Sequence, residues 1–416
     1  MSDLQRRLGL ADAVWIGLGS MIGAGVFSAF APAAREAGSG VLVALLIAAV
    51  VAWCNATSSA QLAVAHPRAG GTYLYGREEL GPWWGFVAGW GFVVGKTASC
   101  AAMALTFAAY AVPAHERSAA AAVVVVLTLV NCAGITRTAL LTRVIVALVL
   151  LGIAVAVVAC LTSDQLVGVY SEHEPVRGLL PYLQAAGLLF FAFAGYARIA
   201  TLGEEVRDPE RVIPRAIVIA LAGAVAVYAL VGITCLAVLG PGPLSFSTAP
   251  LVDALRFSDH AELVPVVRVA AALASAGALL ALGAGVGRTA LAMARERDLP
   301  RFLSAVHPRF GVPHRAELLV GAVVVVLVLS TDLRHAIGFS SFGVLVYYFV
   351  ANLAAHRLSG AARRYPRGVQ VLGAVGCALL VVALPWKSVL AGIAVLVVGL
   401  VYRALRLALD GSAPRP

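Results

Sequence analysis

The chain has 416 residues, of which 61% are hydrophobic and 12% are charged, and its formal net charge is +10. So few charged residues cannot cover a water-soluble protein of this size, so the composition indicates a polytopic membrane protein. One helical crossing takes about 20 apolar residues, so a dozen crossings leave only short connections and exclude a large soluble catalytic domain. The cations lie mainly in these connections without interleaved aromatic residues, so nucleic acid is not an expected partner.

Twelve apolar runs follow one another along the chain and predict an all-α membrane protein with 12 transmembrane helices. The runs cover residues 12–34, 41–65, 83–112, 119–135, 142–162, 180–203, 216–239, 264–292, 317–330, 336–355, 369–385 and 388–406. The ninth and eleventh runs are close to the lower length limit. Losing either one would place the C-terminus on the other side of the membrane.

The positions of Lys and Arg predict the orientation. With the N-terminus inside, the inner segments carry about three times as many of these cations as the outer segments, as the positive-inside rule requires. Residues 1–11 and 407–416 are therefore expected to be cytoplasmic tails of a multi-pass protein of the cell membrane. Two cations, Lys96 and Arg198, lie within apolar runs instead.

Glycines are crowded into the first apolar run, at Gly17, Gly19, Gly23 and Gly25. Each glycine weakens a helix, and loosened backbone is tolerated within a bilayer only where it lines a cavity or is buried in protein. The run therefore predicts a helix break, whose free N–H groups suit an anion such as a carboxylate. Close packing of helices through small residues is the alternative interpretation.

The sixth apolar run has Gly195 beside Phe190, Phe191, Phe193 and Tyr196. Aromatic residues at this spacing are typical of ordinary lipid or core contacts, and it is the position of the run that makes it a candidate for a second break. Paired interrupted helices at corresponding places in two halves of a transporter indicate a central substrate site. Runs one and six would open two inverted repeats. The predicted organisation is a first repeat over 12–162, a second repeat over 180–356, and two further helices over 369–406.

Three stretches of the sequence resemble the amino acid/polyamine/organocation (APC) family of amino acid permeases. Gly19–Phe27 is similar to the family's G-S-x-I-G-x-G-I-F pattern, Phe190–Pro214 resembles its sixth span and following loop, and Gly287–Pro300 resembles its loop after span eight. The resemblance implies a secondary active transporter with the five-plus-five inverted-repeat fold of leucine transporters, two added C-terminal helices, and breaks in helices 1 and 6.

The resemblance also implies where a substrate amino acid would bind. Its carboxylate would meet backbone N–H groups and its α-ammonium would meet backbone carbonyls, and Phe191 would close over the site as an aromatic lid. The implied donors are Ile22, Gly23, Ala24 and Gly25, and the implied carbonyls lie near Phe191 and Ala194. Two unwound helices can hold a zwitterion in this way without charged side chains.

Lys96 is one of two lysines in the chain and lies in the middle of the third run. If that helix begins near Trp83, Lys96 lies about 20 Å along the axis, too deep for its side chain to reach water. Many proton-coupled relatives carry a lysine in the fifth span, where this chain has Val149. We expect Lys96 to supply the missing titratable group or to lie close to the substrate, with a structural counter-charge as the alternative. A charged Lys96 favours neutral or acidic substrates.

Arg198 is a candidate gating residue near the end of the sixth run. It could pair with Glu204, Glu205 or Asp12, or its side chain could extend to water at the membrane surface. Ala197 stands where some relatives of the family have a gating glutamate, so no acidic proton site is expected there.

Several alternatives compete with proton-coupled symport or exchange. Sodium coupling needs hydroxyl ligands from span eight, which offers Ser275 without a deeper Ser or Thr partner. Efflux would use the same backbone site, and a sodium-coupled or efflux-type carrier of amino acids or polyamines is the alternative function. An intramembrane enzyme would need a catalytic motif within the spans, but all histidines lie in loops or at span ends, so an enzyme is not expected. Neither a metal nor another cofactor is expected, and the partners are an amino acid, protons and the bilayer.

Overall fold

The computed structural model describes residues 8–66, 70–134, 139–164, 166, 177–200 and 206–412. Within these ranges the regular structure is helical, apart from one isolated parallel bridge between Leu8 and Val206. Glu204 and Glu205, both predicted as partners of Arg198, lie outside the described residues. Most of the predicted N-terminal tail and the end of the C-terminal tail lie outside them as well.

The described helices follow the order of the predicted runs. They are α1 (Leu10–Met21), α2 (Ala24–Ser28), α3 (Phe30–Ala37), η1 (Gly38–Gly40), α4 (Val41–Ala65), α5 (Gly71–Leu80), α6 (Pro82–Ala111), η2 (Pro113–His115), α7 (Glu116–Cys132), α8 (Ala139–Leu161), α9 (Leu180–Phe193), α10 (Ala197–Ala200), α11 (Pro209–Leu239), α12 (Pro241–Phe246), α13 (Pro250–Phe257), η3 (Ala261–Leu263), α14 (Val264–Arg295), η4 (Arg301–Ser304), α15 (His314–Ser330), α16 (Leu333–Arg357), η5 (Gly360–Ala362), α17 (Arg367–Ala383) and α18 (Trp386–Ser412).

Ten helical segments of the described chain are long and apolar enough to cross a membrane. The remaining two predicted spans, the ninth and the eleventh, fall on α15 and α17, which have 17 residues each. The ninth and eleventh runs were among the shortest in the sequence. The protein is therefore a polytopic membrane protein, while the count of twelve crossings and the inverted repeat stay predictions.

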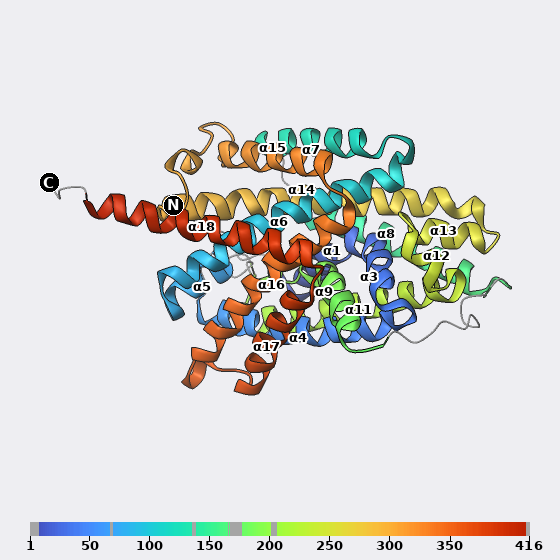
Figure 1. The fold of residues 1–416 in the computed structure, drawn as a ribbon, viewed down its shortest axis with the longest axis horizontal. Coiled ribbons are helices and arrows are strands. Elements are labelled where there is room, and N and C mark those ends of the chain that lie inside the picture. The colour runs from blue at the N-terminus through green and yellow to red at the C-terminus, as the bar shows by residue number, and fades with distance from the viewer. Residues whose placement is uncertain are drawn as a thin grey trace.

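The long helices lie roughly along one direction, with α7 and α15 packed together on one side of α6 and α14 (Figure 1). The short α12 and α13 lie at one end of the molecule, and α5 and the end of α18 lie at the other. Between them, the helix pairs α6 with α16 and α4 with α9 pack in the centre. The two interrupted helices lie within this central group.

The first predicted span is interrupted in the structure. Helix α1 ends at Met21, and Ile22 and Gly23 leave the helical conformation, with ψ angles of 64° and −140°. Helix α2 then begins at Ala24. The sixth span is interrupted too, because α9 ends at Phe193 and a turn over residues 194–196 leads into α10.

Candidate substrate site at the two helix breaks

The two interrupted helices cross where each carries a glycine. A Cβ atom added to Gly195 would lie 2.1 Å from the carbonyl oxygen of Ser20, and one added to Gly25 would lie 2.6 Å from the Cα atom of Ala192. Real Cβ atoms do not approach other atoms so closely. Glycine at these two positions therefore lets backbone meet backbone at both breaks.

The amides at the first break divide into two kinds. The Ile22 N–H donates to the Leu18 carbonyl at 2.6 Å and the Gly23 N–H donates to the Met21 carbonyl at 2.8 Å, so both serve the end of α1. Ala24 and Gly25 open α2, where first-turn N–H groups have no partner within the helix. Of the four predicted donors, these two are the amides that α1 leaves available.

Tyr228 of α11 reaches both breaks with its hydroxyl group. This oxygen lies 2.7 Å from the Met21 carbonyl oxygen and 2.8 Å from the Ala192 carbonyl oxygen, and the side chain is buried. A hydroxyl has one proton, so the two carbonyls share one donor. Tyr228 thereby connects the end of α1 to α9 without using Ala194.

Lys96 contacts the second break. Its side chain is 6% exposed in the middle of α6, and its Nζ atom donates to the Ala194 carbonyl at 3.2 Å. The Tyr348 hydroxyl of α16 donates to the same carbonyl at 3.3 Å. No described carboxylate forms a salt bridge with Lys96. The ammonium group thus occupies the carbonyl that the sequence predicted for the substrate's α-ammonium.

A buried polar network continues from Tyr348 between α4 and α16. The Asn352 amide donates to the Tyr348 carbonyl at 2.9 Å and to the Asn55 side-chain oxygen at 2.6 Å, and the Ser58 hydroxyl donates to the Asn352 oxygen at 2.7 Å. This network was not predicted from the sequence. Asparagine is costly inside an apolar run, and this feature of residues 55 and 352 could have revealed it.

The other predicted site residues have different surroundings. Phe191 is buried in α9, next to the break. Arg198 lies on α10 and is exposed, which fits a side chain that extends to the surface. Asp12, one of its predicted partners, forms its salt bridge with Arg143 of α8 instead.

Charged pairs join helices at both ends of the molecule. Glu36 of α3 pairs with Arg334 near the start of α16, which we call the α3–α16 pair. Asp12 and Arg143 form the α1–α8 pair. A third charged group is Asp298, which is 1% exposed and binds both Arg403 of α18 and Arg77 of α5. Apart from Asp12, none of these residues was predicted to form an ion pair.

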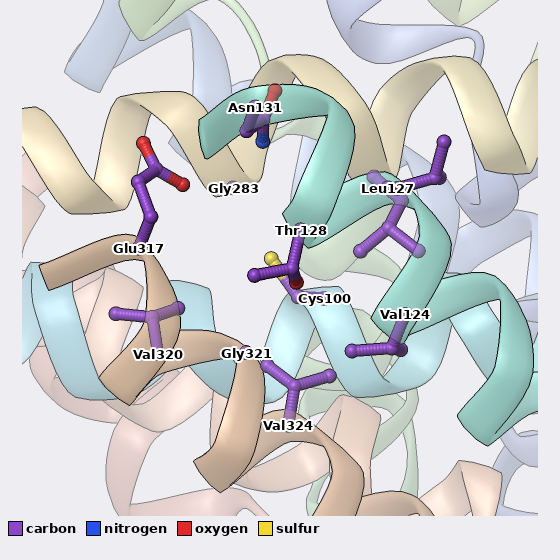
Figure 2. Close-up of a pocket in the computed structure, with 11 residues that line it drawn as sticks. Cys100, Val124, Leu127, Thr128, Asn131, Gly283, Glu317, Val320, Gly321 and Val324 are labelled. Carbon is purple, nitrogen blue, oxygen red and sulfur yellow. The ribbon is translucent and has the colours of Figure 1, made fainter. Parts of the chain in front are cut away.

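A second buried ionisable group, Glu317, was also overlooked. It lies in the first turn of α15 with 4% of its surface exposed, in a pocket between α6, α7, α14 and α15 (Figure 2). The ninth apolar run was predicted to begin at this residue, which made Glu317 a boundary residue. Nothing in a single sequence distinguishes a boundary carboxylate in water from one packed against a neighbouring helix.

Comparison with known proteins agrees with the architecture. The sequence matches the amino acid permease family over residues 12–412. It is 59% identical to an uncharacterized transporter of Mycobacterium tuberculosis over 404 residues, which cover 97% of this chain and 92% of that protein. It is 24% identical over 441 residues to a branched-chain amino acid permease of Bacillus subtilis, covering 96% and 92% of the two chains.

A third relative is named for a different class of substrate. A chloroplastic cationic amino acid transporter of Arabidopsis thaliana is 28% identical over 385 residues, covering 85% of this chain and 66% of its own. The family match spans nearly the whole chain and these relatives are transporters, so the interpretation as an intramembrane enzyme is excluded. The chain is therefore a membrane transporter and belongs to the amino acid permease family.

Proposed function

We propose that this protein moves a zwitterionic amino acid across the membrane by alternating access, with the substrate held at the two helix breaks. The substrate carboxylate would meet the amides of Ala24 and Gly25, beside Ile22 and Gly23. The substrate ammonium would meet the Ala194 carbonyl, and Phe191 would cover the site. A helix start provides donors and a helix end provides acceptors, so the pair matches both ends of a zwitterion.

One observation supports this proposal above the others: the Lys96 ammonium already lies on the Ala194 carbonyl. A carbonyl that accepts one ammonium group can accept another of the same geometry. Substrate binding would then displace Lys96 into an environment without a carboxylate partner, which favours loss of its proton. Lys96 is thus our candidate for proton coupling by symport or exchange, and Arg198 remains a candidate gating residue.

Substrate charge follows from the same contact. A cationic side chain would approach the buried Lys96 ammonium, so we propose that neutral or acidic amino acids are preferred. The branched-chain permease among the relatives has a name that agrees with this preference, whereas the cationic amino acid transporter has one that does not. Ligand screening of the purified protein separates the two classes, because a ligand that binds the folded state raises its apparent stability.

The experiment that tests coupling is uptake into proteoliposomes with Lys96→Met and Lys96→Arg variants. We expect substrate accumulation by the wild type to rise with an inward proton gradient and Lys96→Met to lose this response. Lys96→Arg should bind substrate but should not respond to the gradient, because arginine keeps its proton. Unchanged pH dependence in both variants would contradict the role of Lys96. Replacing sodium by choline in the wild-type assay should leave uptake unchanged, and loss of uptake would favour sodium coupling.

We also propose that the protein resides in the cell membrane with both termini in the cytoplasm. Under this orientation the α1–α8 pair and the Asp298 cluster face the cytoplasm, and the α3–α16 pair faces outward. Impermeant thiol labelling of Ser245→Cys in intact cells checks the orientation. Ser245 lies on α12, which should face outward, so labelling without lysis is the expected result.

A further inference from the structure

A small pocket lies between α6, α7, α14 and α15, apart from the two helix breaks (Figure 2). Its lining comprises Cys100, Val124, Leu127, Thr128, Asn131, Leu279, Gly283, Glu317, Val320, Gly321 and Val324. The space open to the centre of a water-sized sphere is about 20 Å³. One water molecule needs roughly 10–15 Å³ by this measure, so the pocket admits water and excludes an amino acid.

Glu317 is the only carboxylate in the lining. Figure 2 shows its side chain reaching from α15 toward α14. A Cβ atom on Gly287 of α14 would lie 2.5 Å from the Glu317 Oε1 atom, so the carboxylate rests directly on that helix at a glycine. No salt bridge to Glu317 occurs among the described residues. A buried carboxylate without an ion-pair partner is costly when charged, and neutralisation by a proton removes that cost.

The groups that face Glu317 come from each neighbouring helix. Asn131 of α7 hydrogen-bonds its carboxylate, and exposed Arg288 of α14 acts on it from a distance. The thiols of Cys100 on α6 and Cys132 on α7 are the other titratable neighbours. On the flanking segments, α15 itself begins with His314 and Arg315, and η4 begins with exposed Arg301. Glu317 is therefore a single carboxylate whose other titratable neighbours are thiols and exposed cations.

The pocket is connected to Lys96 through α6. Cys100 follows Lys96 by four residues, so both side chains lie on one face of this helix, and Cys100 lines the pocket that holds Glu317. Charge at either group acts on this thiol. Glu317 therefore lies in a pocket that is lined by a residue one helical turn from the ammonium that contacts the second break.

We propose that Glu317 is a second protonation site of the transport cycle: its carboxylate accepts one proton that is relayed from a hydronium ion through water in this pocket, which leaves neutral water and a neutral carboxyl group, and it later releases that proton to a water molecule as hydronium. The proposal rests on the proton-coupled function argued above. It adds an acidic site on the α7–α15 side of α6, opposite in charge to Lys96, at a position the sequence pattern did not indicate.

Carbodiimide labelling tests the site directly. Dicyclohexylcarbodiimide is apolar and adds to protonated carboxyl groups, and mass spectrometry of the modified peptide locates the adduct. While Glu317 is mainly ionised, labelling should rise by up to about tenfold for each unit of pH decrease. Exposed Glu262 serves as the internal control and should stay unlabelled. Absence of labelling at Glu317, or labelling independent of pH, overturns the proposal even if every variant at this position misfolds.

Transport by Glu317→Gln tests coupling, with Glu262→Gln as the matched control. We expect substrate accumulation driven by a proton gradient to be more than about tenfold lower in Glu317→Gln than in wild type. Accumulation by Glu262→Gln should equal that of wild type. Substrate binding, followed by thermal shift, should persist in both. If wild type responds to the gradient and Glu317→Gln responds equally, this proposal alone fails. If wild type does not respond, the proton-coupled function itself fails.

Discussion

At the residue scale, Lys96 and Ala194 illustrate how a contact over 98 positions of sequence gives a buried cation a partner. A lysine in the middle of an apolar run is conspicuous, and its burial could be predicted from the position alone. Its partner could not, because a backbone carbonyl becomes available only where a different helix ends. The overlooked Glu317 shows the converse, since its burial depends on Gly287 of a neighbouring helix.

A glycine at the crossing gives the first prediction at this scale. Gly25→Ala introduces a methyl group where Ala192 leaves 2.6 Å, so we expect a destabilisation of about 1–3 kcal/mol and a loss of most uptake. Gly285→Ala is the control, because no atom lies within 4 Å of the added carbon and alanine favours the helix. Thermal melting in detergent and uptake measure both effects. A Gly25→Ala protein that melts and transports as wild type would show that α2 and α9 do not pack as described.

At the element scale, the two breaks could be predicted in part. Glycine content predicted the break in the first span, and the position of the sixth span together with the family resemblance predicted the other. Neither could show that the amides of Ile22 and Gly23 are hydrogen-bonded at the end of α1. The short helices α5, α12 and α13 were expected to be connections. Their sequences mix apolar residues with charges, prolines or glycines over ten residues or fewer, and only packing against longer helices reveals that they are ordered.

The start of α16 gives a prediction for a single element. Asp332 is the N-cap, and its side chain accepts a hydrogen bond from the His335 N–H at 2.8 Å. Burial alone would raise the pKa of this carboxyl, but hydrogen bonds from His335 outweigh it and lower the pKa below its usual value. A lowered pKa means that the cap stabilises the protein above the unfolded pKa and that this contribution is lost as pH falls through the folded pKa.

Asp332→Ala should therefore cost about 1 kcal/mol at neutral pH and progressively less in acid. Melting temperatures of the variant and wild type across an acidic pH series measure the difference. Asp164→Ala, at an exposed position in the connection after α8, controls for removing a carboxylate away from the helix starts of the described chain. A penalty that stays constant with pH would contradict the role of the ionised carboxylate.

At the scale of the whole molecule, alternating access can be tested by removing the ion pairs at the two ends one at a time. The α3–α16 pair joins helices at one end and the α1–α8 pair at the other. Both pairs are formed in the same structure. The composition predicted a polytopic membrane protein, and the sequence showed that most cations lie in connections between the apolar runs. Which of these cations pairs with which distant carboxylate cannot be predicted from charge counts.

Removing one pair should shift the balance of conformations. Arg334→Gln should favour opening on the side of α3 and α16, and Arg143→Gln should favour the opposite side. A partly exposed pair contributes up to about 1 kcal/mol, so the ratio of the two conformations should change by up to about fivefold. The apparent KM for uptake should fall in the first variant and rise in the second. A shift in the same direction for both would contradict opposed gates.

The contact of Lys96 with the second break has a consequence for the unloaded protein. A carrier whose site is vacant must bury bare backbone dipoles when it closes, and this cost hinders its return without cargo. Here a tethered cation remains on the Ala194 carbonyl. We therefore expect the empty protein to return without cargo, and one-way filling of vesicles should then not require amino acid on the opposite side of the membrane.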